Sequence, residues 1–589
     1  MTFRKFATIV LFCLFGILIS AVQLVAQVLP NPEAHSANLE TAHRDSLWNN
    51  YRVEQEIRQF REQPSGIAIS SPQAPPVLDG LSDEKIFALR QVIFENPPIS
   101  ISQNELDAVA QRYIFQEQVS LRDLYEMLAE IDALFDARHV IGRAVLPVQD
   151  VEDGIVYVQI IEGKFGATTI DIKRQPFFPE WQKKDLIPVN RLFGRNFVEN
   201  QVRFQRGAVL NVKNLEEEIL RFNRKFRTQL LAELEPGDDL GTSNLKLTAV
   251  APQPVSGGFY CDSSGRETSG RIRNGYFVQL QSLAGIDESF FCSYDTTEGT
   301  SYLTMFGDMP VSPFGTSFEM GYDYGTPKTL YGPLAGLNIT GTSQRYRPGI
   351  RQLLRNTKEH RTDVSVQYEG FESDTSFDGF VNYREKVTSG TFGISDTYRT
   401  KNTVRFLSLN WQTGRAGVAP NPIFGDFTHQ NFHTLQGGLT KVWYPDKNWT
   451  FLVKSNGQLA LSPLSQSRIF QMGGMATVRG APEGLITGDS GYVINLEARR
   501  LIGNWNNKAG VEAFTFFDHG GVFYRTYPEE YHPSDYLFSV GTGLNMNLGR
   551  YVSATIGYGQ PIFTAESHRD DYRDKLRHGN GYFTIRAQF

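Results

Sequence analysis

The chain has 589 residues, of which 40% are hydrophobic, 12% are aromatic and 53 are glycine, so it holds enough apolar material for more than one domain. Its formal net charge is −6, and no long block of lysine and arginine is present. This balance argues against a nucleic-acid-binding protein.

The N-terminus is expected to be a signal peptide covering residues 1–26. Arg4 and Lys5 precede an apolar stretch, and Ala26 offers a small residue for cleavage before Gln27. An uncleaved membrane anchor is the alternative, because the apolar stretch is of intermediate length. Further along the chain we find no run of about eighteen apolar residues, so no transmembrane helix is predicted there.

Residues 27–63 are expected to form a polar helix and residues 64–83 a linker. The helix has only a thin apolar stripe, made by Trp48, Tyr51, Ile57 and Phe60. The linker begins with "PSGIAISSPQAPP", in which prolines alternate with small residues. Such a helix is either a frayed tail or a movable plug.

Residues 84–163 and 164–253 repeat one order of elements, namely a strand, two helices and two strands. In the first repeat, Ser102 and Glu105 have the spacing of a capping box at the start of a helix. Its second helix is marked by apolar residues at helical spacing: Leu121, Leu124, Leu128, Ile131 and Leu134. In the second repeat, "VENQVRFQRG" and "NVKNLEEEILRFNRKF" are expected to be the helices. Two small α+β domains of one topology follow from this repetition.

Helical periodicity stops near residue 254, and strands are expected from there to residue 589. In "GYFTIRAQF" apolar and polar residues alternate up to Phe589, as in a strand between lipid and a wet lumen. "FSVGTGLNMNL" repeats the alternation with a small and polar second face, which suits a barrel lumen better than the core of a soluble sandwich. Roughly 335 residues at about 21 per strand and connection give about sixteen strands. The sequence therefore predicts a transmembrane β-barrel of about sixteen antiparallel strands after two small α+β domains.

Two segments of this barrel contain opposite charges. "TVRGAPEGL" places Arg479 among turn-forming residues, in a connection over 463–490 that is long enough, at about 28 residues, to fold back inside. "FTFFDHGG" ends a run in which Asp518 must face the lumen, because lipid would not tolerate its carboxylate. Either the two side chains form a pair or each is solvated separately. In a wet lumen, such a pair would contribute only about 0–1 kcal/mol.

Enzymatic and metal-binding signatures are not found. The sequence has no phosphate-binding glycine loop, no Gly-x-Ser-x-Gly elbow and no zinc pattern, so neither an enzyme nor a cofactor is predicted. His429 and His433 are four residues apart, but in a strand-and-loop context this spacing does not bring them together on a metal. A barrel lipase is an unfavourable alternative, since two periplasmic domains would be an odd appendage for one.

The two cysteines of the expected barrel are predicted to be free thiols. Cys261 and Cys292 are separated by a whole strand, and two steps of about 4.8 Å place their backbones about 10 Å apart. This exceeds the roughly 7 Å that a disulfide can bridge.

Five segments carry a resemblance to a known family: "LPVQDVEDGIVYVQIIEG", "LEPGDDLGTSNLKL", "YCDSSGRETSGR", "MGGMATVRGAPEGLITGDSGYVINLEAR" and "FTFFDHGGV". Together they resemble the outer-membrane transporters of two-partner secretion, the ShlB/FhaC/HecB type, over nearly all of the mature chain and in the right order. The resemblance implies an N-terminal plug helix, two periplasmic POTRA domains over 84–163 and 164–253, and a sixteen-stranded barrel over 254–589.

The resemblance also implies a long loop that folds into the pore and contacts the inner wall. Its loop motif corresponds here to Val478, Arg479 and Gly480. Its wall motif corresponds to Phe516, Asp518 and Gly520. In the family the loop arginine contacts the wall aspartate. One departure is Ala481, which stands where the family usually has an aromatic residue.

The function implied is that of an outer-membrane pore, which moves an unfolded partner exoprotein from the periplasm to the cell surface. The partner's strands are expected to pair with open sheet edges of the POTRA domains. Outer-membrane lipid and the barrel-assembly machinery are the other expected partners, with Phe589 as the C-terminal signal for insertion. A barrel-assembly insertase of the same superfamily is the alternative, and a plain adhesin or structural barrel is a third.

Overall fold

The protein is described by a computed structural model in which one compact unit ends at Pro252 and another takes in Gln253–Phe589. The described residues are 84–589 except for 117, 152, 175–186, 189–191, 203, 333–334, 420–427, 506–508, 526–533, 550 and 565–576. The predicted signal peptide, plug helix and linker, over 1–26, 27–63 and 64–83, lie outside the described residues. Among the described residues, no helix has the length and apolarity needed to span a membrane.

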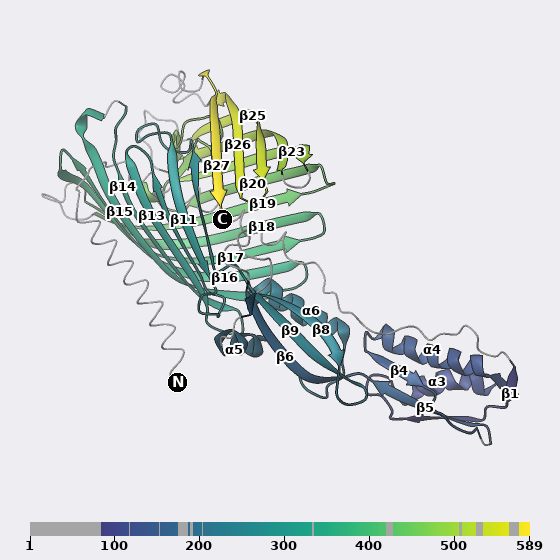
Figure 1. The fold of residues 1–589 in the computed structure, drawn as a ribbon. Helices are drawn as coiled ribbons and strands as arrows, with labels where there is room; N and C mark the ends of the chain where they lie inside the picture. Colours follow the sequence, from purple (N-terminus) through teal and green to yellow (C-terminus); the bar gives the residue numbers. More distant parts are fainter. Residues whose placement is uncertain are drawn as a thin grey trace. The chain divides into compact units, whose positions relative to one another are not determined.

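The first small domain has two helices lying side by side on a three-stranded sheet (Figure 1). In the sheet order β2-β5-β4, β5 is parallel to β2 and antiparallel to β4. The elements are β1 (Lys85–Phe87), β2 (Gln91–Glu95), α3 (Gln103–Ile114), β3 (Val119–Ser120), α4 (Leu121–Ala137), β4 (Gly142–Val145) and β5 (Ile155–Glu162).

The sequence explains why both helices start where they do. Ser102 and Glu105 form the predicted capping box of α3, and Ser120 and Asp123 form another at the start of α4. The apolar stripe of α4 is buried in the core of the domain through Leu124, Met127, Leu128, Ile131 and Phe135.

The second small domain has a four-stranded sheet in the order β7-β6-β9-β8. Its elements are β6 (Lys164–Arg174), β7 (Ile187–Pro188), α5 (Leu192–Gln201), α6 (Val212–Lys225), β8 (Gln229–Pro236) and β9 (Thr242–Ala251). The first helix was expected over "VENQVRFQRG" but begins earlier, at Leu192, and ends at Gln201. This earlier start places Phe197 against the rings of Phe222 and Phe226 in the core.

The two small domains belong to one compact unit and share backbone hydrogen bonds. The amide of Ile141 donates to the carbonyl of Leu210 at 3.2 Å, and that of Val212 donates to the carbonyl of His139 at 2.8 Å. The end of α4 in the first domain is therefore tied to the start of α6 in the second.

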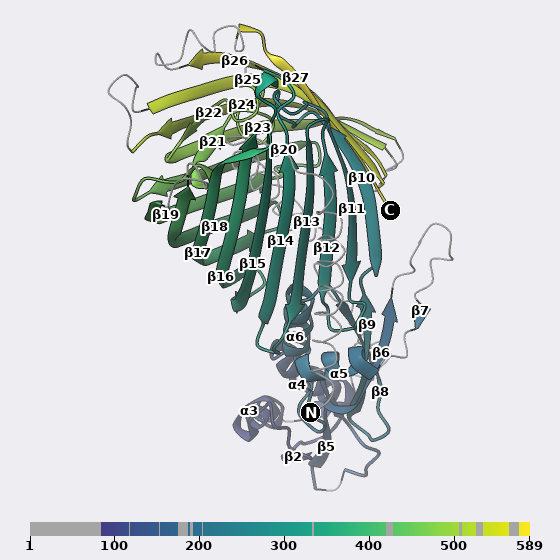
Figure 2. The same cartoon turned by 90° about the vertical axis from the view of Figure 1, so that its left-hand side faces the viewer.

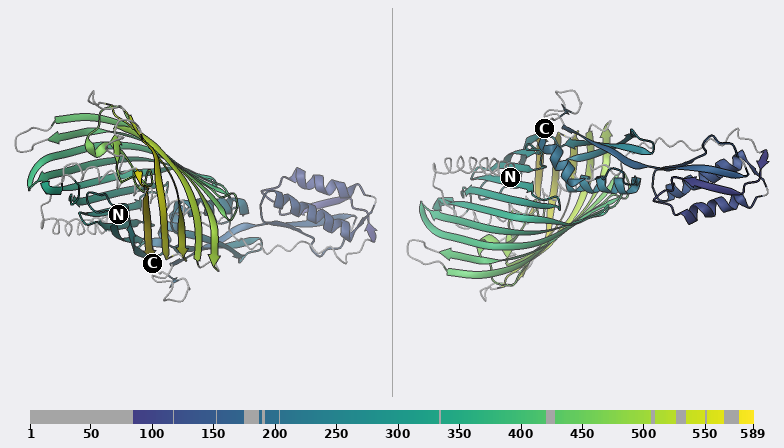
Figure 3. Two further views of the ribbon diagram at one scale, coloured as in Figure 1. Left: turned by 90° about the horizontal axis from the view of Figure 1, so that it is seen from above. Right: turned by 90° about the horizontal axis from the view of Figure 1, so that it is seen from below.

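Sixteen antiparallel strands close a barrel, in which β27 pairs with β10 (Figures 1 and 2). The views from above and below show the wall curving round on itself (Figure 3). The strands are β10 (Val255–Asp262), β11 (Arg273–Gln281), β12 (Ser289–Thr296), β13 (Thr300–Pro310), β14 (Thr316–Pro327), β15 (Ile339–Asn356), β16 (His360–Phe377), β17 (Phe380–Arg399), β18 (Thr403–Ala419), β19 (Thr428–Trp443), β20 (Trp449–Ala460), β23 (Ser490–Trp505), β24 (Ala509–Phe523), β25 (Ser534–Leu548), β26 (Val552–Thr564) and β27 (Asn580–Gln588). The predicted strand number and barrel fold are confirmed.

The two faces of the wall follow the predicted alternation. A row of register neighbours on the outer face is apolar and exposed, as a lipid-facing band requires: Phe392, Trp411, Leu435 and Leu459. On β27, Ile585 is exposed outside while Tyr582 is buried on the inner side. Cys261 on β10 and Cys292 on β12 flank β11, and both are free thiols, as predicted.

One connection, residues 461–489 between β20 and β23, is much longer than its neighbours and folds inward. We call it the pore loop. It contains the short helix η2 (Gln466–Arg468) and a small hairpin of β21 (Phe470–Met472) and β22 (Ile486–Gly488). The hairpin packs on the wall through a cluster that includes Met472, Ile486, Val493, Val522 and Leu537. A second short helix, η1 (Ala335–Leu337), lies in the connection before β15.

Candidate functional site at the pore-loop tip

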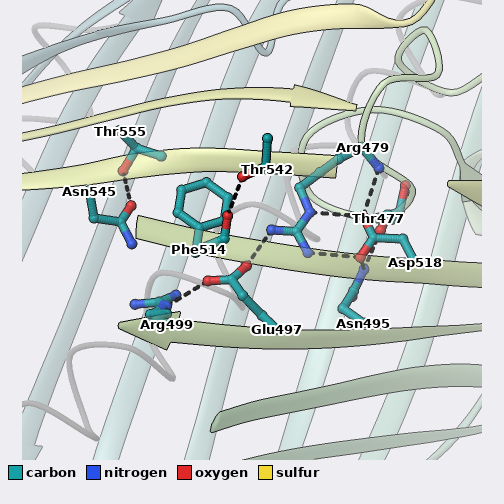
Figure 4. Close-up of polar contacts among 10 residues, drawn as sticks. All are labelled: Thr477, Arg479, Asn495, Glu497, Arg499, Phe514, Asp518, Thr542, Asn545 and Thr555. Carbon is teal, nitrogen blue, oxygen red and sulfur yellow. Dashed lines mark hydrogen bonds and ion pairs between the residues drawn. The ribbon is translucent and has the colours of Figure 1, made fainter. Parts of the chain in front are cut away.

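Arg479, at the tip of the pore loop, forms an ion pair with Asp518 of β24 (Figure 4). Its Nε donates to Asp518 Oδ2 and its Nη2 to Asp518 Oδ1, both at 2.8 Å. The backbone amide of Arg479 also donates to Oδ2, at 3.0 Å. This bidentate geometry is the strong form of a charge-assisted hydrogen bond. The predicted pairing of these two residues is therefore present.

The pair is buried, so the expectation that it sits in a wet lumen is wrong. The side chain of Asp518 is 0% exposed and that of Arg479 is 12% exposed. The sequence shows that both residues belong to the lumen side, but it does not show that the loop itself excludes water from the wall. In a desolvated site, removing one partner is far more costly than at a surface, because the other charge stays buried.

A second carboxylate, which the sequence analysis did not single out, also binds the arginine. Glu497 of β23 accepts a hydrogen bond from Arg479 Nη1, and its other oxygen accepts one from Arg499 Nε at 2.6 Å (Figure 4). The segment "VINLEARR" contained a pattern that could have identified Glu497. Asn495, Glu497 and Arg499 are two residues apart, so on a strand their side chains share one face. The site thus holds two acids and two arginines.

An aromatic face completes the arginine's surroundings. The guanidinium carbon of Arg479 lies 3.7 Å from the centre of the Phe516 ring, close enough for a cation–π contact. Phe516 packs in turn beside Phe514 and Tyr582. Ala481 is itself buried in the apolar cluster under the hairpin. The wall therefore gives this arginine an aromatic partner although the loop lacks the aromatic residue at position 481.

Both motif glycines are explained by the close approach of the loop to the wall. Gly480 has φ +90°, and a Cβ there would lie 2.3 Å from the carbonyl oxygen of Gly559 on β26. At Gly520 a Cβ would lie 2.2 Å from Met472 Sδ of the loop hairpin. Val478, the remaining loop-motif residue, is fully buried against the wall.

The tip backbone is also held by polar side chains of three strands. Asn495 Nδ2 of β23 donates to the carbonyl of Thr477 at 2.5 Å and to Asp518 Oδ1 at 2.8 Å. Ser539 of β25 donates to the carbonyl of Arg479, and Asn580 Nδ2 of β27 donates to that of Gly480 at 2.8 Å. Sequence patterns did not identify these donors, because they come together only when the barrel closes.

The turn of the tip is fixed from within the loop by one half-buried acid. Oε1 of Glu483 accepts a hydrogen bond from the amide of Met475 at 2.6 Å. The other oxygen of this carboxyl group is buried as well.

A cavity of about 380 Å³ in the lumen borders the site. Arg479, Glu497 and Arg499 contribute to its lining, together with Phe514, Asn545 and Thr555 (Figure 4). In the part of the chain that the structure describes, no group of three or more histidine, cysteine, aspartate or glutamate residues could hold a metal ion. His429 and His433 both lie on β19, where four residues of strand span about 13 Å. The arrangement suits a site that holds the pore loop in place and shapes the passage through the lumen beside it.

Phe589, the predicted C-terminal signal, ends the chain on the outer face of the barrel. Its ring is exposed, and its backbone exchanges two hydrogen bonds with Gly257 of β10. The last residue therefore helps to close the seam between the first and last strands.

Two family models match the chain. The model described as haemolysin secretion/activation protein ShlB/FhaC/HecB matches residues 241–546, and the ShlB-type POTRA domain matches residues 87–163. Among curated relatives, the outer membrane transporter CdiB of Dickeya dadantii is 22% identical over 550 residues, covering 88% of this chain and 89% of the relative. The heme/hemopexin transporter protein HuxB of Haemophilus influenzae is 23% identical over 529 residues, covering 87% of this chain and 90% of the relative.

The fold is similar to that of CdiB from Escherichia coli, with a TM-score of 0.61 and 16% identity, over 96% of this chain and all of the other. The first family model covers just over half of the chain and includes the whole tip of the pore loop. The protein therefore belongs to the ShlB/FhaC/HecB family, the outer-membrane pores of two-partner secretion, with its POTRA region in the periplasm.

Proposed function

We propose that this chain threads one unfolded exoprotein through its barrel, and that Arg479, Asp518 and Glu497 hold the pore loop in the position that passage requires. The observation that carries the proposal is the buried contact of one loop arginine with two wall carboxylates. Two buried acids on the inner wall have no obvious value to a plain adhesin or structural barrel. The relatives' names, which refer to transport, support the same conclusion.

The periplasmic unit is proposed to receive the exoprotein. In the sheet order β7-β6-β9-β8, strand β8 pairs only with β9 among the described residues and so has a free edge, and Leu231 on this strand is exposed. An extended segment of the exoprotein can add to such an edge by backbone hydrogen bonds, with little demand on its sequence. We place the domain boundaries of this unit at 84–163 and 164–253, with the barrel over 254–589.

Further parts of the proposal concern residues outside the described ranges and further partners. We infer that residues 1–26 direct export, that the helix over 27–63 plugs the pore, and that the barrel-assembly machinery inserts the chain by way of Phe589. We infer no catalytic activity, since folding of the exoprotein outside the cell is sufficient to give transport its direction.

The test is co-expression with a candidate exoprotein, chosen among the products of the neighbouring genes. The exoprotein should reach the medium when the chain is present and stay in the periplasm when it is absent. The insertase alternative predicts a different result, namely that loss of the chain lowers the amounts of other outer-membrane barrels. Unchanged export in the absence of the chain would contradict the proposal.

A further inference from the structure

The first limb of the pore loop is held on a part of the wall that the tip does not touch. Residues 461–469, which we call the strap, run from the end of β20 to the loop hairpin. Arg468 of the strap forms an ion pair with Glu369 of β16. The hydroxyl of Ser467 donates to Glu385 Oε1 of β17 at 2.5 Å, and Gln430 Nε2 of β19 donates to the carbonyl of Pro463 at 2.7 Å.

The polar groups that fix the strap are buried. The side chains of Arg468 and Glu369 are 9% and 8% exposed, and Glu385 is fully buried. The guanidinium of Arg468 also lies 5.6 Å from the centre of the Phe371 ring. Leu464 covers a small apolar cluster on four neighbouring strands: Phe371, Val387, Ala416 and Phe432. The strap thus packs closely against the lumen side of β16–β19 and covers it.

The arginine of the strap makes fewer charge-assisted hydrogen bonds than the arginine of the tip. Arg479 makes a bidentate contact with one carboxylate and a further contact with a second. Arg468 makes one side-chain hydrogen bond to one carboxylate. Bidentate charge-assisted pairs are the stronger kind. The hairpin between strap and tip is fixed separately by its apolar cluster on β23–β25. If part of the loop moves while the rest stays seated, the strap is that part.

The wall next to the strap suits a moving polypeptide. The lumen-facing side of β17–β20 carries uncharged polar residues, beside the charged side chains of Glu385 and Lys454: Ser389, Ser408, Asn410, Gln412, Gln436, Asn456 and Gln458. On β14–β15, by contrast, lumen-facing side chains form ion pairs, among them Arg345–Asp323 and Arg351–Glu319. Charges of either sign on a passing chain would bind to the ion-paired wall and be retarded there, whereas the mostly uncharged wall of β17–β20 offers mainly weak hydrogen bonds.

We propose that the strap is a movable gate of this pore, separate from the plug proposed for residues 27–63, and that Arg468 is a positioning residue, whose ion pair with Glu369 keeps the passage along β17–β20 closed. The strap lifts from β16–β19 while Arg479 stays on Asp518. This inference rests on the proposed function, since it assumes that a polypeptide crosses the barrel.

Reversible crosslinking of the full chain tests which part of the loop must move. With Cys261 and Cys292 replaced by serine, Ser467→Cys is combined with Glu385→Cys and bridged by a short, reducible bis-methanethiosulfonate reagent. The matched control joins the tip to β27 through Met475→Cys and Thr584→Cys, whose native side chains are 3.7 Å apart. Each variant in its reduced form is its own baseline for secretion.

Bridging the strap should lower secretion at least tenfold, and dithiothreitol should restore it. Bridging the tip should leave at least half of the secretion of the reduced form. Secretion that continues through a bridged strap would overturn the inference, and so would a bridged tip that blocks secretion as fully as a bridged strap.

Channel recordings in planar bilayers without any exoprotein separate this inference from the proposed function. Arg468→Gln should raise the open probability, and the exchange Arg468→Glu with Glu369→Arg should bring it back toward that of the unaltered chain. Arg384→Gln is the control, because it removes an ion pair with Asp374 on the outer face of the wall. Equal open probabilities for Arg468→Gln and Arg384→Gln would overturn the gate. A normal gate in a chain that exports nothing would instead contradict the proposed function alone.

Discussion

Arg479 sits between two acids in a site from which water is largely excluded, and this decides what its loss would do. Without it, Asp518 and Glu497 would remain buried, and among the described residues Arg499 would be the remaining cation that bonds to either of them. Breaking a buried pair by removing one partner costs about 3–5 kcal/mol. This free energy is lost from the docking of the loop on the wall and not from the barrel, because the barrel is closed by the backbone pairing of sixteen strands.

We therefore expect Arg479→Ala to release the loop tip while the barrel still inserts. Secretion should fall sharply, and heat-modifiable migration on gels should stay normal. Arg479→Lys keeps the charge but loses the bidentate geometry, so its effect should be intermediate. Full secretion by Arg479→Ala would show that the site has no part in transport.

A charge exchange gives a sharper form of the same test. Arg479→Asp with Asp518→Arg should not restore secretion by itself, because the new aspartate would face Glu497. Adding Glu497→Gln removes that repulsion and should improve secretion over the double variant. If the triple variant is no better than the double, Glu497 is not a partner of the loop.

Gly480 is a position in the loop at which any residue with a Cβ atom is unfavourable. Its φ of +90° and its contact with Gly559 both oppose a Cβ. Gly480→Ala should cost about 1–3 kcal/mol in loop seating and expose the loop to trypsin added outside the cell. Gly390→Ala is the control, since a Cβ there meets nothing within 4 Å. Equal trypsin sensitivity of the two variants would contradict this account.

At the scale of single elements, helix α3 gives a pH-dependent prediction. Hydrogen bonds from the side chain and backbone of Ser102, and then from Arg138, lower the pKa of Glu105 from 4.5 to about 2. The pKa is lower in the folded state, so this contribution is present above pH 4.5 and is lost as the pH falls toward 2.

Thermal unfolding of the periplasmic unit, residues 84–252, followed by circular dichroism should show this. The unit is compact and has two apolar cores of its own. Glu105→Gln should lower the melting temperature at pH 6 and lose less between pH 5 and pH 3 than the unaltered unit. If the melting temperatures of the two proteins fell equally between pH 5 and pH 3, the carboxyl group of Glu105 would not be the group whose protonation destabilises the unit.

The local elements were largely predictable from sequence, because each depends on neighbours in the chain. The alternation in "GYFTIRAQF" places Tyr582 inside and Ile585 outside, and the capping box at Ser102 starts α3. The contacts of the loop were predictable only through the family motif. Glu497, Ser539 and Asn580 meet the tip because of strand register and closure, which no local pattern contains. The same holds for the pairing of Arg468 with Glu369.

At the scale of the whole molecule, the second POTRA domain is expected to be needed for transport and dispensable for insertion. Deleting residues 165–252 removes the free edge of β8 but leaves every barrel strand intact. Secretion should be abolished, while the barrel should still be found in outer-membrane fractions. Secretion that survives the deletion would exclude the proposed role of this domain in receiving the exoprotein.

The contacts of the loop tip are distributed over the wall in an ordered way. Glu497, Asp518 and Ser539 belong to β23, β24 and β25, and Gly559 and Asn580 belong to β26 and β27. Each of the five strands made after the loop thus supplies at least one contact to it. The tip can be fully seated only after the last of them has joined the sheet. A fully seated loop tip therefore requires that every strand of the wall has been synthesised and assembled. In a chain that stalls before β27, the tip lacks the contact that this last strand supplies.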